Sequence, residues 1–325
     1  MIPPIALQEP ELTNSNTTTQ PLHEVKKQIQ KVIKGKPEVV DRLLICLLAR
    51  GHVLLEDVPG VGKTTLARAL AATLGLQFSR IQFTPDLLPH DLLGTNVLNP
   101  QAGTFTFLKG PVFTHLLLAD EINRASPRTQ SALLEAMNEQ QVTIDGETYP
   151  LAAPFMVIAT ENPVEFQGTY PLPEAQLDRF MMRLSLGYPR AEEELAMLRE
   201  RRTADPLQYI ETVLSSDELP MLQSQVAEVT VDDDVARYML RLITRTRTES
   251  GVEIGGSPRA SLSLYKASQA KAFLDGRTYV SPKDVRELFA DCVTHRLVLN
   301  AAARYGGTSV AQLIQSIADT EPVPS

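Results

Sequence analysis

The stretch Glu56-Asp-Val-Pro-Gly-Val-Gly-Lys-Thr64 has the residue types and spacing of a loop that binds phosphate groups. Gly60 and Gly62 allow backbone N–H groups to converge on an anion, and the N-terminus of the helix expected next adds its dipole. Lys63 could then reach the β- and γ-phosphates of a nucleotide, and the Thr64 hydroxyl could bind Mg²⁺. We therefore predict a nucleotide site formed by Asp57, Val58, Pro59, Gly60, Val61, Gly62, Lys63, Thr64 and Thr65.

Position 57 departs from the common form of this loop, which has glycine there. The chain has Asp57 instead, and a carboxylate at this point must face away from the phosphates. Taken alone, the stretch could also be a glycine-rich turn between a strand and a helix, with an exposed lysine.

Two adjacent carboxylates, Asp120 and Glu121, follow the apolar run 115–119. This run is expected to be a buried strand, and ligands bind at the carboxyl edge of a parallel sheet. Successive side chains point to different sides, so Asp120 is placed to hold Mg²⁺ and Glu121 to polarise a water that attacks a γ-phosphate. For an isolated Asp-Glu pair, a cap of the next helix would be the favoured interpretation, but together with the phosphate loop the pair predicts a nucleotide site.

Apolar runs and turn residues indicate how these groups are positioned. Buried strands are predicted at 52–56, 78–83, 115–119, 155–160 and 181–186, with helices before them from residue 22 to 47 and between them near 63–74 and 127–139. Strands that alternate with helices indicate a parallel sheet covered on both faces. Two hairpins interrupt this alternation, one at 141–149 around Asp145-Gly146 and a less regular one at 93–111.

Strand patterns nearly disappear after residue 190. Helices are predicted near 191–202, 216–226, 232–248, 258–274 and 281–295. The first 20 residues are rich in Pro, Thr, Asn and Gln, without an apolar period. We therefore expect a flexible tail at 1–20, an α/β nucleotide-binding domain at 21–188 and an all-helical domain at 189–325.

Composition excludes several other classes of protein. The 325 residues are 43% hydrophobic with a net charge of −8, and the two halves are equally acidic: residues 1–189 hold 15 Lys/Arg against 19 Asp/Glu, and 190–325 hold 16 against 20. Binding to nucleic acid through clustered basic residues is therefore disfavoured. Cys46 and Cys292 form no CxxC motif, so neither a disulfide framework nor a zinc site is supported.

No segment resembles a membrane anchor or a signal peptide. The longest uninterrupted apolar run, 43–49, is far shorter than a membrane span, and no basic residue precedes Lys26. We expect a cytoplasmic protein with no insertion into membranes.

The phosphate loop and the blocks 119–137 and 159–180 together resemble the MoxR family of AAA+ ATPases. The resemblance covers roughly residues 22–310. It implies a P-loop core with strand order 5-1-4-3-2, a helical lid, and ATP and Mg²⁺ bound between neighbouring subunits of a ring, commonly a hexamer. The hairpins at 93–111 and 141–149 then match the helix-2 insert and pre-sensor hairpin of the subgroup that contains dynein, magnesium chelatase and replicative helicase motors.

The resemblance implies roles for three further residues. Asn162 matches the sensor-1 amide that orients the attacking water, although an Asn before Pro163 is often a turn residue. Arg179 matches the arginine finger that reaches a neighbour's γ-phosphate; the alternative is an ion pair within the domain, with Asp178 or another carboxylate. Arg259 matches sensor 2 at the start of a lid helix, with a solvated surface arginine as its alternative.

Other positions near these motifs are less clearly assigned. Arg124 and Arg128 follow Glu121 closely and could act across the subunit contact or form surface ion pairs. Lys36 stands where the family usually has a glutamine beside the adenine.

The functional hypothesis follows from these motifs and the resemblance. ATP hydrolysis assisted by Glu121 would be completed by a neighbour's Arg179, and lid motion would remodel client proteins. Proteins with von Willebrand factor type A domains are partners that the family implies. A nucleic-acid motor and a non-hydrolysing scaffold assembled by ATP remain the alternatives.

Overall fold

Five parallel strands form the central sheet of the computed structural model, which describes residues 15–101, 103–163, 168–200 and 205–324. The order is β2-β5-β8-β1-β9, which is the expected 5-1-4-3-2 when only the core strands are counted. The strands are β1 (Val53–Glu56), β2 (Phe78–Gln82), β5 (Leu116–Asp120), β8 (Met156–Glu161) and β9 (Met182–Leu184).

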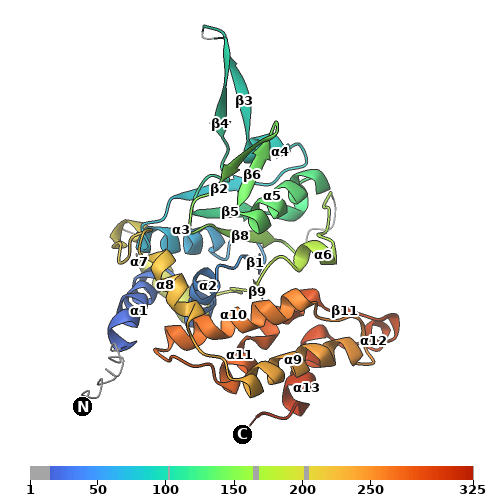
Figure 1. Cartoon of the computed structure of the whole chain (residues 1–325). Helices are drawn as coiled ribbons and strands as arrows, with labels where there is room; N and C mark the ends of the chain where they lie inside the picture. Colours follow the sequence, from blue (N-terminus) through green and yellow to red (C-terminus); the bar gives the residue numbers. More distant parts are fainter. Residues whose placement is uncertain (1–14, 102, 164–167, 201–204, 325) are drawn as a thin grey trace, which may run out of the picture.

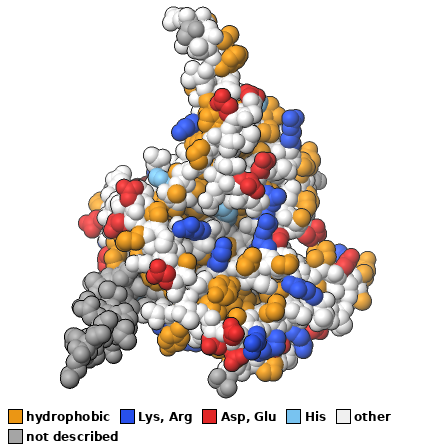
Figure 2. Space-filling model, in the orientation of Figure 1, with side chains coloured by type: hydrophobic (Ala, Val, Ile, Leu, Met, Phe, Trp, Pro, Cys, Tyr) orange, Lys and Arg blue, Asp and Glu red, His pale blue; other side chains and the backbone are white. Residues whose placement is uncertain are grey.

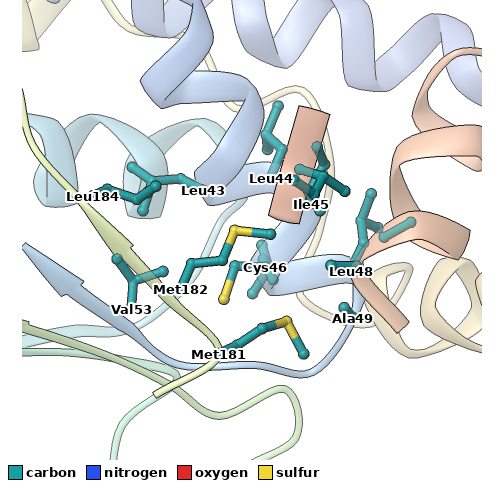
Figure 3. Close-up of a cluster of buried hydrophobic side chains, with 14 of the residues drawn as sticks. Leu43, Leu44, Ile45, Cys46, Leu48, Ala49, Val53, Met181, Met182 and Leu184 are labelled. Carbon is teal, nitrogen blue, oxygen red and sulfur yellow. The ribbon is translucent and has the colours of Figure 1, made fainter. Parts of the chain in front are cut away.

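The central strands β1, β5 and β8 are buried on both faces because they are almost continuously apolar, whereas the edge strand β2 is largely polar and partly exposed. Along β5, Leu116 and Leu118 join one core cluster, whereas Leu117 and Ala119 join the other. The first cluster includes side chains of α1 (Ser15–Val32), α2 (Pro37–Leu48) and α3 (Lys63–Thr73), and the second includes those of α4 (Pro89–Leu93) and α5 (Pro127–Glu139). Figure 3 shows α2 side chains packed against those of β1 and β9.

Both predicted hairpins are present. The first consists of β3 (Gly94–Asn99) and β4 (Thr104–Lys109) and projects from the end of the molecule opposite the lid (Figure 1). The second consists of β6 (Gln141–Ile144) and β7 (Glu147–Pro150), joined by Asp145 and Gly146, both with positive φ. The Asp145 carboxylate accepts a hydrogen bond of 2.7 Å from the Asn96 amide, so the two hairpins are linked.

The projecting hairpin carries exposed apolar side chains. Phe105 is 70% exposed and Leu108 55% exposed. Figure 2 shows hydrophobic side chains along this arm. Further down, the Phe107 ring stacks on Tyr149 with centroids 4.2 Å apart, so only the outer part of the arm lacks packing from the second hairpin.

The C-terminal part is mainly helical, as predicted. It contains α7 (Ala191–Glu200), η2 (Pro206–Tyr209), α8 (Leu219–Ala227), α9 (Asp233–Thr248), α10 (Pro258–Leu274), α11 (Pro282–Val293), η3 (Thr294–Arg296), α12 (Ala301–Tyr305) and α13 (Val310–Thr320). It also contains a two-stranded sheet of β10 (Val252–Ile254) and β11 (Val298–Leu299), so the expectation of a purely helical domain is wrong in this detail. Strands of two or three residues are too short to show an alternating pattern.

The prediction of a flexible tail at residues 1–20 is wrong for its last six residues. Helix α1 begins at Ser15, so residues 15–20 are helical, and the prediction for 1–14 falls outside the described residues. Thr19 is buried, which shows that a polar side chain ahead of the apolar period already packs against the domain. Among the described residues, no helix is long and apolar enough to cross a membrane.

Candidate active site

The phosphate-loop sequence forms the turn between β1 and α3. Gly60 and Gly62 have φ of +86° and +101°, a conformation that favours glycine, and Gly62 is the N-cap of α3. Lys63 is nearly buried, and its Nζ donates a hydrogen bond of 2.8 Å to the Asp57 carbonyl oxygen. Burial lowers the pKa of Lys63, while the nearby carboxylates of Asp57, Asp120 and Glu121 oppose this shift. The loop therefore has the geometry to receive an anion, with its lysine directed into the turn.

The Asp57 carboxylate is turned toward the segment that follows β9. It is 5% exposed and accepts hydrogen bonds from Ser185 Oγ at 2.7 Å, Leu186 N at 2.6 Å and Gly187 N at 2.9 Å. These donors compensate a buried negative charge at the start of the loop. The position can therefore hold an aspartate in place of the usual glycine.

Asp120 ends β5 and is held from both sides. Its Oδ1 accepts a hydrogen bond of 2.7 Å from Thr160 Oγ1, and its Oδ2 lies 2.7 Å from the Arg80 guanidinium. Thr160 is on β8 and Arg80 on β2, the two strands that flank β5. The carboxylate is thus fixed at the carboxyl edge of the sheet.

Glu121 has a backbone φ of +57°, which is uncommon for a residue with a side chain. Its N–H donates to Thr160 Oγ1 at 2.8 Å, and its Oε2 accepts from Gln82 Nε2 at 2.8 Å. Arg124 Nε lies 3.0 Å from the same carboxylate oxygen. Glu121 is therefore held in a strained conformation by groups from β2, β8 and its own turn.

Asn162 lies directly after β8 and is 6% exposed. The preceding residue, Glu161, accepts the Asp57 N–H through its carbonyl at 3.2 Å, so Asn162 follows a direct contact with the phosphate loop. The structure thus brings the loop, Asp120, Glu121 and Asn162 to one edge of the sheet.

Three residues of this edge were missed by the sequence analysis: Thr160, Arg80 and Gln82. They lie on strands next to β5 in the observed order. Once the strand order is known, Gln82 and Thr160 can be placed near the Asp120-Glu121 pair, because they lie near the carboxyl ends of β2 and β8, and Arg80 lies two residues before Gln82.

A second carboxylate cluster lies beside the loop and was also missed. Glu56 and Glu161 are register partners at the ends of β1 and β8, and Arg183 NH1 lies 2.8 Å from Glu56 Oε2. Burial and the negative charge of Glu56 raise the pKa of Glu161 to about 7, although Arg183 partly offsets this. Glu161 therefore changes its charge near neutral pH.

Arg179 and Arg259 belong to a different part of the structure from the phosphate loop. Arg179 follows α6 (Glu174–Leu177), and its NH1 donates to the Leu134 carbonyl at 2.6 Å. Figure 1 shows α6 well separated from α3. Asp178 does not supply this contact, since its Oδ1 accepts from Ser257 Oγ at 2.8 Å and pairs with Arg296 Nε at 2.9 Å.

Arg259 is exposed in the first turn of α10, whose N-cap is Ser257. Its positive charge helps to lower the pKa of Arg296, for which burial is the main cause. The bond between Ser257 and Asp178 therefore joins the start of α10, and Arg259 with it, to the segment that carries Arg179.

Two residues of the candidate site supply oxygen ligands that suit Mg²⁺. Thr64 supplies a hydroxyl and Asp120 a carboxylate, both of the hard type that this ion prefers. Within the described residues, no group of three His, Cys, Asp or Glu side chains could hold a metal ion. The donor set fits an ion that is held jointly by the protein, nucleotide phosphates and water.

Comparisons with known proteins identify the same two regions. Residues 52–182 match the ATPase family associated with various cellular activities (AAA), and residues 244–317 match the AAA lid domain. The chain is similar to a protein from Cytophaga hutchinsonii, described as an ATPase, whose crystal structure superposes with a TM-score of 0.89. The two are 41% identical, and the match covers 96% of this chain and 97% of the other.

Curated relatives match over almost the whole chain. Chaperone MoxR1 of Mycobacterium tuberculosis is 42% identical, over 91% of this chain and 81% of its own. Protein MoxR of Methylorubrum extorquens is 30% identical, over 92% and 94%. The uncharacterized protein YeaC of Bacillus subtilis is 47% identical, over 92% and 93%.

Proposed function

The chain belongs to the MoxR family of AAA ATPases, whose members hydrolyse ATP, and from this premise we propose where and how the reaction takes place. ATP binds at residues 57–65, with Asp120, Glu121 and Asn162 around its γ-phosphate. The observation that carries this proposal is the meeting of the loop, both carboxylates and the Asn162 position at one edge of the sheet.

The loop residues bind the nucleotide. Lys63 uses its remaining N–H donors for the β- and γ-phosphates, while Gly60 and Gly62 let backbone N–H groups approach them. Thr64 and Asp120 would hold Mg²⁺, which, when bound, draws negative charge away from the phosphates. The hydrogen bond from Thr160 keeps the Asp120 carboxylate in place for this role.

Glu121 is the proposed general base. Its carboxylate accepts the proton of the attacking water, and Asn162 orients that water. Gln82 and Arg124 bind the Glu121 carboxylate in this structure and must yield part of that contact to the water. The Glu121 backbone is fixed by its hydrogen bond to Thr160 Oγ1, which limits the directions in which the side chain can move.

Arg179 and Arg259 serve the site of a neighbouring subunit in this proposal. Two facts support it: Arg179 is bound to α5 at Leu134, and Ser257 ties the start of α10 to the same segment. One surface would then present two cations to the neighbour's γ-phosphate. This arrangement requires a ring, which we propose is a hexamer of identical chains.

We further propose that the ring remodels client proteins. One relative is named a chaperone, and the exposed apolar arm provides a surface for unfolded or partly folded chains. Changes in nucleotide would move the lid against the α/β domain, and partners with von Willebrand factor type A domains would deliver clients. Neither half of the sequence is basic, which disfavours a nucleic-acid motor.

The test combines two variants with one control. Glu121→Gln should retain ATP binding and lower turnover by at least about 100-fold, because a general base contributes roughly 10²–10⁴ in rate. Arg179→Ala should lower turnover by about 10³-fold or more. Arg237→Ala, which removes an exposed arginine of α9, should leave turnover unchanged.

Mixing the two inactive variants separates shared sites from sites within one chain. An Arg179→Ala subunit still has its own Glu121 and can receive Arg179 from a Glu121→Gln neighbour. We expect the mixture to recover part of the lost turnover, measured as phosphate release. Zero recovery, with mixed assembly shown by native mass spectrometry, would contradict the neighbour's role.

A further inference from the structure

Asp57 differs from the other residues of the phosphate loop because its side chain binds another segment of the chain. We propose that Asp57 is a positioning residue that couples the phosphate loop to residues 185–188, the segment that joins β9 to α7 at the start of the C-terminal helical part. This inference rests on the proposed nucleotide site and adds a path by which that site acts on the C-terminal helical part. Three hydrogen bonds of 2.6–2.9 Å to a buried carboxylate form the link.

The backbone of Asp57 connects the same residue to the two other parts of the site. Its carbonyl accepts the Lys63 hydrogen bond, and its N–H donates to the Glu161 carbonyl on β8 at 3.2 Å. The Lys63 ammonium has three N–H donors, so it can bind a phosphate while it keeps this bond to the Asp57 carbonyl. A bound nucleotide would therefore be connected through Lys63 to the residue whose side chain holds the 185–187 segment.

The linked segment is short and held at its far end. Lys36 Nζ donates to the Tyr188 carbonyl at 3.0 Å, and α7 begins at Ala191. Few residues are thus available between Gly187 and α7 to absorb a displacement. Backbone amides of Leu186 and Gly187 donate directly to the Asp57 carboxylate, so the coupling passes through two main-chain groups rather than through long side chains.

These two amides also report on the link. Amide hydrogen exchange of Leu186 and Gly187 should be measured in the full chain with and without a non-hydrolysable ATP analogue and Mg²⁺. Wild-type protein should show exchange slowed by about tenfold on binding, which corresponds to about 1.4 kcal/mol. The amides of residues 60–65 are followed in the same experiment as a measure of nucleotide binding.

The variant Asp57→Gly restores the glycine of the common loop and removes the carboxylate. We expect the analogue to slow exchange at 60–65 in this variant but to have no effect at Leu186 and Gly187. Ser185→Ala removes one of the three hydrogen bonds and should give an intermediate response. It also provides a readout if Asp57→Gly does not fold.

The matched control is Asp232→Asn, which weakens the bond between a carboxylate N-cap and the Asp234 backbone amide at the start of α9. Its response at Leu186 and Gly187 should equal that of the wild type. If the hydrogen bonds to Asp57 had only a structural role, exchange at Leu186 and Gly187 would not depend on nucleotide. That result in the wild-type protein would overturn the proposed coupling. The coupling would also be overturned if the analogue slowed exchange at Leu186 and Gly187 as much in Ser185→Ala and in Asp57→Gly as it does in the wild type.

Failure of the proposed function has a different signature. If the analogue changes no exchange at residues 60–65 of the wild type, the nucleotide site itself is wrong, and the coupling is wrong with it. A response at 60–65 without a response at 185–187 rejects only the coupling.

Discussion

Replacing Arg296 with methionine should destabilise the protein by at least about 3 kcal/mol, because removing one partner of a buried ion pair costs roughly 3–5 kcal/mol. Arg296 is 3% exposed and pairs with Asp178 Oδ1 at 2.9 Å. It also donates to the carbonyls of Cys292 at 2.6 Å and Phe180 at 2.8 Å, and to Ser263 Oγ at 3.0 Å. The substitution removes these hydrogen bonds and the positive charge beside Asp178, whose carboxylate keeps the hydrogen bond from Ser257.

The assay is urea unfolding followed by circular dichroism. With a slope of about 3 kcal/mol per molar, near the upper end for small proteins, the midpoint should fall by about 1 M. Arg286→Met is the control, since the partly exposed Arg286–Asp319 pair contributes at most about 1 kcal/mol.

A double-mutant cycle with Asp178→Asn tests the reason for the effect. The two single changes remove the same ion pair, so their combined destabilisation should be smaller than the sum by at least about 1 kcal/mol. Full additivity, or a loss below about 1 kcal/mol in Arg296→Met, would refute the assignment of a strong buried pair. Because Asp178 precedes Arg179, turnover should fall in both single variants, measured below the unfolding transition.

Further predictions concern the site and the arm. The raised pKa of Glu161 means that the folded state holds this proton more tightly than the unfolded state, so stability should fall as pH rises from about 4.5 to about 7, by up to about 3 kcal/mol. Glu161→Gln should remove that loss, seen as a higher urea midpoint than wild type at pH 8 and little difference at pH 4.5. Thr160→Val should lower kcat by about tenfold with little change in ATP affinity, because it removes one hydrogen bond to the Asp120 carboxylate; calorimetry and phosphate release check both parts. Lys63→Ala should weaken ATP binding by more than about tenfold in the same calorimetry, since a charged hydrogen bond contributes about 1.5–3 kcal/mol. Tyr149→Ala should remove the ring stacked on Phe107 and increase protease cleavage at the arm relative to the rest of the chain.

Much of the fold was predictable because its signals are local. Apolar runs of three or four residues form most of β1, β5 and β8, and Asp145-Gly146 specified the second hairpin. The strand order came from the family resemblance, since periodicity alone does not define which strands are neighbours. The start of α1 at Ser15 was not predicted, because Ser, Asn and Thr residues lack an apolar period.

The site was predictable where one segment carries several of its residues. The phosphate loop and the Asp120-Glu121 pair are such segments. Thr160, Arg80 and Gln82 approach those carboxylates only through pairing of the strands, so their contacts depend on tertiary structure. The contact between Arg179 and the Leu134 carbonyl could not be predicted for a further reason. Every residue has a main-chain carbonyl, so the residue type at position 134 gives no information about this acceptor.

The first hairpin is an arm that is held near its base by the second hairpin and projects beyond it. Strand β3 has six residues, which at about 3.4 Å per residue gives an arm of roughly 20 Å. The Phe107 ring is stacked on Tyr149 with a centroid distance of 4.2 Å and lies edge-on to Phe113 with a centroid distance of 5.6 Å. These ring contacts hold the base of the arm, whereas Phe105, nearer the tip, is exposed. A tilt of about 10° at that base would carry the outermost pair of the arm, Asn99 and Thr104, through about 3 Å, close to the rise of one residue in a strand. A small rotation near the sheet would thus displace the tip by a distance that matches the repeat of an extended polypeptide.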